Sequence, residues 1–403
     1  MNFRRIIDMK IVIVPSGFKE CLGAEEVAQA IERGVKRFDP SICMEAIPMI
    51  DGGEGFAKTI TNIKKGTLIS KKVAGPVGNK VNSHFGIFEE KGKRTAVIEM
   101  AAVAGLKLVP RDQRNPLKTT TYGVGELILS ALDEGVDNIL IGCGDSGTSD
   151  GGAGMAQAMG VRFFDNQHRE VNIKGGVDLL NVSSIDTALL DKRLSTVKID
   201  VACNWHNVLC GGKGVARVFG PQKGATPNQV EQLSAALEQY ANLIYETIGT
   251  DVRLLPGSGA SGGLGAGLIA FTNAILHPRF DIIMNYIDIE EKISTADLVF
   301  TAEGSLDFQT PNGKIPSEVA RIAKKKNIPV VAITGTIGKG ADLNYYTGID
   351  AFCSIIQKPT SLEKAMKKAP EWIEESTESI LRQISIGSAI AQRKLNNESV
   401  YLK

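Results

Sequence analysis

The sequence predicts an α/β protein in which buried parallel strands alternate with helices. Three observations lead to this class. Short runs rich in β-branched residues recur along the chain, glycine turns follow these runs, and stretches with helical periodicity come after the turns. The chain has 403 residues, which is enough for two domains.

The individual elements can be placed in chain order. Expected strands cover residues 11–14, 96–100, 138–141, 197–202, 298–301, 330–333 and 351–354. The first expected helix covers residues 24–37, where Val27, Ile31 and Val35 recur on one face. A longer helix is expected at 226–247, because Thr226 and Pro227 are a natural N-cap and first-turn pair. We expect a terminal helix at the polar C-terminal end.

Charge and composition exclude several classes of protein. Lys plus Arg number 46 and Asp plus Glu number 45, so neither nucleic acid nor an acidic membrane surface is an expected partner. Six cysteines are scattered without a Cys-x-x-Cys pair, which argues against a zinc site and a disulfide framework. The sequence contains no apolar window long enough to span a bilayer and no signal-peptide core, so we expect a cytoplasmic protein.

Glycine accounts for 43 residues, and its densest runs follow the expected strands. These runs are residues 142–155, residues 256–268 and TGTIGKG at 334–340. In an open α/β sheet, ligands bind beyond the carboxyl ends of the strands, where backbone NH groups attract anions. None of the runs is a Walker A sequence or a dinucleotide fingerprint. Tight packing of helix on strand could explain any one run, but several together favour phosphate binding.

Acidic residues accompany these and similar turns, namely Asp51, Glu54, Glu126, Asp145, Asp150, Glu303 and Asp307. Carboxylates at such turns can hold magnesium and orient a hydroxyl nucleophile, as phosphoryl transfer requires. Asx-turns and helix caps are the structural alternative for each of them. Lys19, Lys223 and Lys314 could neutralise a phosphate or a carboxylate, although an isolated lysine is usually solvated. The four histidines form no hydrolase or HExxH pattern, and His206 is the one worth watching.

The order of these motifs resembles the bacterial glycerate kinase family, of the type that makes 2-phosphoglycerate. Nine collinear segments carry the resemblance: PSGFKECLGA, IPMIDGGEGF, AGPVG, VIEMAAVAGL, TTTYGVGELI, ILIGCGDSGTSDGGAGM, NVLCGGKGVARVFGPQKGA, LPGSGASGGLGAGL and DLVFTAEGSLDFQTPNGKIPSEVA. The resemblance implies a Rossmann-like or flavodoxin-like parallel-sheet domain with a second α/β domain inserted into it. We place the discontinuous domain at residues 1–72 and 290–403 and the inserted domain at 73–289, with the active site in the cleft between them.

The resemblance also implies transfer of the γ-phosphoryl group of ATP, with Mg²⁺, to a hydroxyl of D-glycerate. The candidate catalytic residues at matching positions are Lys19, Asp150, Asp307 and Lys314. Asp150 or Asp307 would orient and deprotonate the hydroxyl. The candidate substrate-binding residues are Asp145, Asn204, Asn207, Ser305, Gln309 and Thr310. The candidate magnesium ligands are Asp51, Glu54 and Glu303, and the candidate nucleotide-binding residues are Gly257, Gly259, Gly262 and Gly263. The expected partner is a small-molecule substrate, and a homodimer is left open.

Several motif positions depart from the family's usual pattern. Ser16 stands where the family usually has an aspartate, Asp145 where it has a glycine, Asn204 where it has an aspartate, and Ser305 where it has an arginine. If that arginine binds the substrate carboxylate, its loss weakens glycerate binding, since a contact to a charged group is worth about 1.5–3 kcal/mol.

Three functions therefore stay open at this point. The first is a D-glycerate 2-kinase in which these substitutions are tolerated. The second is a kinase of another small hydroxylated compound, with Asp145, Asn204 and Ser305 reshaping the acceptor site. The third is a non-catalytic binding protein, which the retained carboxylates argue against.

Overall fold

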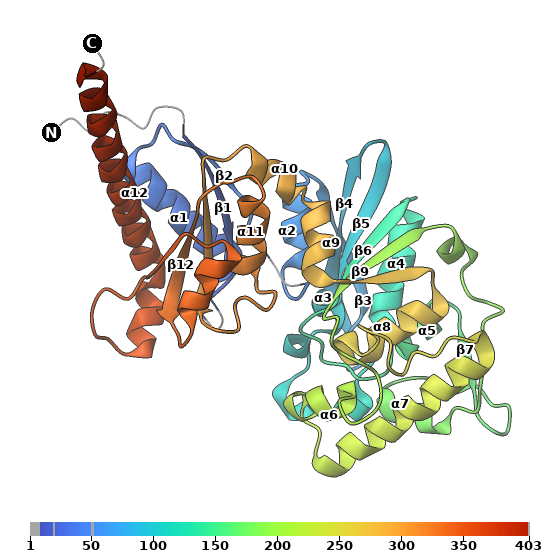
Figure 1. Cartoon of the computed structure of the whole chain (residues 1–403). Helices are drawn as coiled ribbons and strands as arrows, with labels where there is room; N and C mark the ends of the chain where they lie inside the picture. The colour runs from blue at the N-terminus through green and yellow to red at the C-terminus, as the bar shows by residue number, and fades with distance from the viewer. Residues whose placement is uncertain (1–8, 19–20, 50–51, 402–403) are drawn as a thin grey trace. The chain divides into compact units, whose positions relative to one another are not determined.

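In the computed structural model the described residues are 9–18, 21–49 and 52–401, the side chains from residue 395 onward excepted. They form two compact units (Figure 1). Unit 1 combines the chain before residue 51 with the chain from residue 288 onward, and unit 2 is the continuous segment 51–287. The predictions for Lys19 and Asp51 fall outside the described residues. In the described ranges we find no helix that is both long and apolar enough to cross a membrane.

Unit 1 is built on a parallel sheet with the strand order β13-β12-β11-β1-β2. The strands are β1 (Lys10–Pro15), β2 (Cys43–Ala46), β11 (Leu298–Leu306), β12 (Val330–Ile337) and β13 (Ala351–Ser354). The sequence predicts all of them except β2. This edge strand was missed because its sequence, CMEA, contains no β-branched residue.

Helices cover both faces of this sheet. On one face α1 (Ala24–Phe38) packs against α12 (Leu362–Tyr401), and α11 (Ile315–Lys324) lies on the other face (Figure 1). The short helix α10 (Ile289–Ser294) packs on α11. Gly34 allows the close approach of α1 and α12, because a Cβ there would lie 2.5 Å from the carbonyl oxygen of Glu374. The two ends of the chain therefore share one hydrophobic core.

Unit 2 is built on a mixed sheet with the strand order β10-β9-β6-β5-β4-β3. Parallel pairing joins β5 (Lys93–Glu99), β6 (Asn138–Gly142), β9 (Lys198–Cys203) and β10 (Ala274–Pro278). The two other strands, β3 (Thr67–Ala74) and β4 (Lys80–Glu90), pair antiparallel. The sequence predicts β5, β6 and β9. It missed β3, β4 and β10. Half of the residues of β3 are polar and half are exposed, so this strand does not read as a buried run.

The helices of unit 2 are distributed over both faces of its sheet. One core lies between the sheet, α4 (Tyr122–Asp133) and α8 (Ala260–Phe271). A second core joins α8 to α5 (Ala153–Ala158), α6 (Val215–Phe219), α7 (Pro227–Ile248) and the small antiparallel pair of β7 (Arg162–Phe164) and β8 (Ser184–Asp186). The other face carries α2 (Phe56–Ile63) and α9 (Arg279–Tyr286), while α3 (Ala101–Ala104) follows β5 (Figure 1).

The division into units differs from the predicted domain boundaries at one of the two crossings. The predicted boundary after residue 72 falls inside unit 2, which begins at residue 51. The physical reason is that α2 packs on β4 and β5, and β3 pairs along its whole length with β4. The return to unit 1 comes after residue 287, close to the predicted boundary after 289. The α/β class itself is confirmed.

Candidate active site

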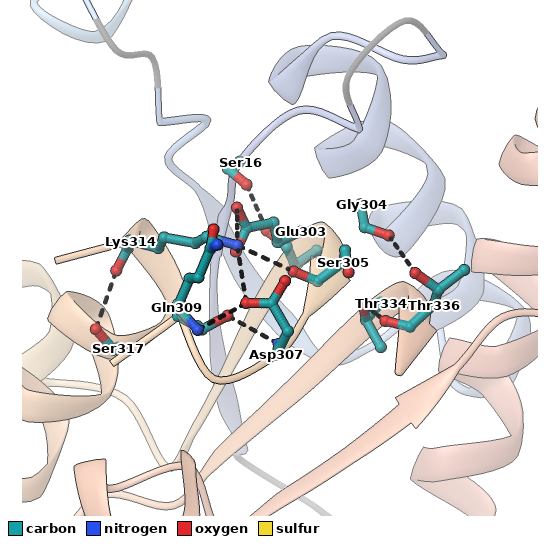
Figure 2. A network of polar contacts seen from close by, with 12 residues as sticks. Ser16, Glu303, Gly304, Ser305, Asp307, Gln309, Lys314, Ser317, Thr334 and Thr336 are labelled. Atoms are coloured by element: carbon teal, nitrogen blue, oxygen red, sulfur yellow. Dashed lines mark hydrogen bonds and ion pairs between the residues drawn. The ribbon is translucent and has the colours of Figure 1, made fainter. Parts of the chain in front are cut away.

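A lysine and two carboxylates form a polar cluster at the carboxyl end of the unit 1 sheet (Figure 2). The Nζ atom of Lys314 lies 3.4 Å from Asp307 Oδ1 and 3.7 Å from Glu303 Oε1. These three side chains are between 19% and 28% exposed. A ligand can therefore reach the cluster, while its charges are screened less than those of a fully exposed ion pair.

The turn after β11 holds Asp307 in place (Figure 2). The Gln309 NH donates to Asp307 Oδ1 at 2.8 Å, and the Asp307 NH donates to Thr310 Oγ1 at 3.1 Å. Thr310 is fully buried, so its hydroxyl supports the turn, whereas Gln309 is exposed. The amide of Asn344 also donates to the Asp307 carbonyl, at 3.2 Å. The structure thus brings six predicted site residues together in unit 1: Glu303, Ser305, Asp307, Gln309, Thr310 and Lys314.

Two hydroxyl residues of β12 adjoin this cluster and were missed by the sequence analysis. In the sheet register Thr334 lies beside Glu303 and Thr336 beside Ser305. The sequence assigns Thr334 and Thr336 to a glycine turn, but β12 continues through them to Ile337. Glycine fits within this strand because a Cβ at Gly335 would lie 2.6 Å from the Gly304 carbonyl oxygen.

In unit 2, two carboxylates bind the turn that begins α2. Glu99, at the end of β5, accepts hydrogen bonds from the NH groups of Gly55 at 2.9 Å and Ala57 at 3.1 Å. Asp145 Oδ2 accepts from the Glu54 NH at 3.0 Å. The side chain of Glu54 in turn forms an ion pair with Lys107. The structure therefore brings the predicted residues Glu54 and Asp145 together.

Glu99 and Lys107 were missed by the sequence analysis, although Glu99 has a signal in the sequence. It is a single acidic residue inside the apolar run AVIEM, and it is 2% exposed. A carboxylate in such a run must find hydrogen-bond donors, because a buried charge without partners is very costly. Lys107 is largely exposed and has no comparable signal.

Glu99 gives a pH-dependent prediction. Burial raises the pKa of the Glu99 carboxyl above its ordinary 4.5, and the charges of Glu54 and Asp145 add to this shift. A raised folded-state pKa means that the contribution of Glu99 to stability is complete below pH 4.5 and is lost as the pH rises through the folded value. We therefore expect the free energy of unfolding of the parent protein to fall relative to that of Glu99→Gln between pH 4.5 and neutrality.

The measurement is urea unfolding followed by Trp205 fluorescence, in a Trp372→Phe background so that only unit 2 is observed. A difference between the two proteins that stays constant with pH would contradict this prediction. Glu246→Gln, a change at an exposed glutamate of unit 2, serves as the control.

Asp150, a predicted catalytic residue, is completely buried. Its carboxylate accepts hydrogen bonds from the Thr121 NH at 2.7 Å, the Thr121 hydroxyl at 2.9 Å, the Gly152 NH at 3.2 Å and the Gly154 NH at 3.3 Å. It therefore ties the first turn of α4 to the first turn of α5. A general base must come within hydrogen-bond reach of the substrate hydroxyl, and the more accessible Asp307 meets this requirement better. A catalytic role for Asp150 stays a prediction.

The glycine run at 256–268 packs closely on the run at 142–155. A Cβ at Gly262 would lie 1.9 Å from the Thr148 carbonyl oxygen, and one at Gly263 would lie 2.7 Å from the Gly151 Cα. These contacts account for glycine at both positions.

Several backbone groups of the predicted nucleotide-binding run are also bonded within the chain. The Gly259 NH donates to the Asn207 carbonyl at 3.1 Å, and the Gly263 NH donates to the Gly259 carbonyl at 3.2 Å. A Cβ at Gly257 would lie 2.7 Å from Cys203 Sγ. Nucleotide binding by Gly257, Gly259, Gly262 and Gly263 stays a prediction.

Asn204 and Asn207 lie in the turn that follows β9. Asn204 Oδ1 accepts from the NH of the exposed His206 at 3.2 Å, which forms an Asx-turn. The carbonyl of Asn207 joins this turn to Gly259, as described above. Both asparagines thus shape the end of β9, and their contact with substrate stays a prediction.

Comparisons with known proteins point to a single family. The model of the glycerate kinase family matches residues 11–385. A glycerate kinase from Bacillus subtilis (strain 168) is 44% identical over 95% of this chain and 99% of its own length. A glycerate 2-kinase from Escherichia coli (strain K12) is 42% identical over 94% of this chain and 99% of its own length. A crystal structure described as that of a glycerate kinase 2 from Salmonella typhimurium LT2 matches with a TM-score of 0.81 and 43% identity, over 94% of this chain and 99% of that one. The chain therefore belongs to the glycerate kinase family.

Proposed function

We propose that this protein transfers the γ-phosphoryl group of ATP to a hydroxyl of D-glycerate, giving 2-phosphoglycerate, in a reaction that uses Mg²⁺. The observation that carries the proposal is the cluster in unit 1, where the Lys314 ammonium lies 3.4 Å from Asp307 and 3.7 Å from Glu303. Phosphoryl transfer needs positive charge and carboxylates at one place, and it needs no covalent nucleophile. The membership of the glycerate kinase family supports D-glycerate as the acceptor.

Each charged residue of the cluster has a proposed role. The Lys314 ammonium would stabilise negative charge on the transferred phosphoryl oxygens, and this attraction is stronger where water is partly excluded. The Asp307 carboxylate would orient the substrate hydroxyl and accept its proton. The Gln309 NH, which donates to Asp307 Oδ1 at 2.8 Å, would keep that carboxylate in position.

Glu303 and Asp307 also have the chemistry that magnesium prefers. Mg²⁺ takes oxygen ligands, and in kinases it is commonly held by one or two carboxylates together with substrate phosphates. When bound, the ion supplies positive charge against the phosphate oxygens. We propose Glu303 as a ligand. Among the residues with described positions, no three His, Cys, Asp or Glu side chains converge as a metal-binding group. Asp51 and Glu54 stay predicted ligands, the former outside the described residues and the latter paired with Lys107 in unit 2.

The test is ADP release from Mg·ATP by the purified protein with D-glycerate, corrected for ATP hydrolysis without acceptor. Phosphorus NMR of the product separates 2-phosphoglycerate from the 3-phosphate. A panel of small hydroxy acids, polyols and amino alcohols follows. Turnover of another acceptor with none of D-glycerate would support the second function left open by the sequence, and no turnover with any acceptor would support a non-catalytic protein.

Asp145 gives a prediction that bears on the choice of acceptor. Its φ of +48° lies in the left-handed region that favours glycine, the residue the family usually has there. Its carboxylate accepts a hydrogen bond from the Glu54 NH and so supports the turn that begins α2. Because the lost hydrogen bond and the relieved strain are each worth about 1 kcal/mol, we expect Asp145→Gly to keep its melting temperature within a few degrees.

Because the Asp145 carboxylate is bonded to the Glu54 NH within the chain, we expect kcat/KM of Asp145→Gly for D-glycerate to stay within about threefold of the parent value. Steady-state kinetics measure this. A rise of about tenfold or more would show that Asp145 shapes the site for a different acceptor.

The cellular location belongs to the proposal as well. All six cysteines carry free thiols, including the exposed Cys43. Free thiols persist in a reducing compartment. We therefore propose the cytoplasm as the location, and the homodimer stays a prediction.

A further inference from the structure

Lys223 lies in the segment FGPQKGA, which the proposed function does not use, and its side chain turns into the protein. The residue closes a short turn (Pro221–Lys223) between α6 and α7 and is 3% exposed. Its Nζ atom donates to Ser146 Oγ at 2.8 Å and to the Thr148 carbonyl at 2.6 Å. The sequence suggests a lysine that meets a phosphate or carboxylate, but in this structure its partners belong to the chain.

The residues around Lys223 fix this inward direction. Gly224, which follows it, has a φ of +97°, and a Cβ there would lie 2.3 Å from the Arg114 carbonyl oxygen. Thr226 and Gln229 then form the capping box that starts α7. A glycine in the left-handed region between the lysine and a capped helix leaves the turn little freedom. The conformation of the turn therefore directs the Lys223 side chain into the protein interior.

Both partners of Lys223 belong to the loop between β6 and α5, which has no regular secondary structure from residue 143 to 150. On its other side the loop is held by the Gly147 NH, which donates to the Ala104 carbonyl at 2.8 Å, and by the Leu106 NH, which donates to the Asp145 carbonyl at 2.9 Å. Lys223 thus attaches the loop to the turn that precedes α7, through its two hydrogen bonds. The loop presents the exposed Asp145 beside Glu54.

Burying this ammonium costs free energy, because the charge loses its hydration. Favourable contacts within the protein must offset that cost. Burial lowers the pKa of Lys223 to about 7, and the charge of Asp150 partly opposes that shift. A buried charge is retained where it is hydrogen-bonded and where it fixes a particular arrangement. For Lys223 that arrangement is the shape of the 143–150 loop.

We propose that Lys223 is a positioning residue for phosphoryl transfer, because its ammonium sets the backbone shape of the 143–150 loop through Ser146 and Thr148 and so determines how the acceptor is held. The inference rests on the proposed function. It assigns Lys223 no contact with either substrate. A loop that is displaced by about 1 Å can cost a large factor in rate or binding.

The test compares Lys223→Met, Ser146→Ala and the double variant with the parent protein. Lys213→Met, a change at an exposed lysine that precedes α6, is the matched control. We expect Lys223→Met to raise KM for D-glycerate about tenfold while KM for ATP stays within about twofold. Ser146→Ala keeps the lysine and is expected to raise the same constant by less. The double variant should be no worse than Lys223→Met, because the one contact that Ser146→Ala removes is already lost in Lys223→Met.

A second readout does not depend on activity. Hydrogen exchange of peptides covering residues 143–155 should be faster in Lys223→Met and in Ser146→Ala, and unchanged in Lys213→Met. Unchanged exchange in Ser146→Ala together with native constants for both substrates would overturn the proposal, and so would equal rises in both KM values. If the parent protein does not phosphorylate D-glycerate, the proposed function fails, whereas the exchange data still decide whether Lys223 holds the loop.

Discussion

Lys314→Met is expected to lower kcat with D-glycerate by about 100- to 1,000-fold, the range found when one preorganised charge donor is removed from an active site. In the proposed function the Lys314 ammonium stabilises charge on the phosphoryl group. It also lies 3.4 Å from Asp307 and 3.7 Å from Glu303. Without it the two carboxylates lose a cation that they share, so the binding of a negatively charged phosphate becomes less favourable.

Steady-state kinetics with varied ATP and varied D-glycerate measure this effect. Lys324→Met is the matched control, because that lysine ends α11, the helix that begins directly after Lys314, and pairs with Asp350 at 3.4 Å. An exposed pair of this kind contributes little, so the control should keep both its activity and its melting temperature. A Lys314→Met enzyme within about fivefold of the parent kcat would show that the unit 1 cluster is not the reaction centre.

Asp150→Ala is expected to lower the free energy of unfolding of unit 2 by about 3–5 kcal/mol, because the change leaves buried groups without their partner. Four hydrogen bonds to the carboxylate disappear at once, two of them from Thr121. The buried ammonium of Lys223 also loses a nearby negative charge. Asp150→Asn should lose less, because its amide oxygen can still accept from Thr121.

Urea unfolding followed by Trp205 fluorescence in the Trp372→Phe background reports on unit 2. Asp112→Ala, a change at an exposed aspartate of the same unit, is the control and should be nearly neutral. If Asp150→Ala were as stable as the parent protein but inactive, Asp150 would belong to the chemistry, as the sequence allows, and not to the structure.

The fold could be predicted from the sequence wherever burial and local pattern coincide. The runs at 11–14, 138–141 and 298–301 are buried β-branched segments, and each became part of a parallel strand. The strand β3 was missed, because it forms by antiparallel pairing with β4 and not by burial of its own side chains. The boundary expected after residue 72 differs from the start of unit 2 at residue 51 for a related reason, because β3 pairs with β4 inside that unit.

The candidate site could be predicted only in part. Glu303 lies near the end of β11, and Asp307 and Lys314 follow that strand within a few residues, so its carboxyl end brings the three together. Asp150 differs, since its environment comes from Thr121, a distant residue in the sequence that immediately precedes α4. The run at 256–268 is a similar case, because the sequence cannot show whether a glycine makes room for a ligand or for the backbone of residues 148–151.

The sharing of one core by the two ends of the chain affects the order of events during synthesis. Strand β1 leaves the ribosome first, but its neighbour β11 begins at Leu298 and the covering helix α12 at Leu362. At about 5–20 residues per second, β1 waits roughly 15 to 60 s for its partner. Unit 2 is continuous and can complete its own sheet in that interval. The apolar β1 and α1 therefore stay uncovered longest, which makes the amino-terminal segment the part of the nascent protein most in need of a chaperone.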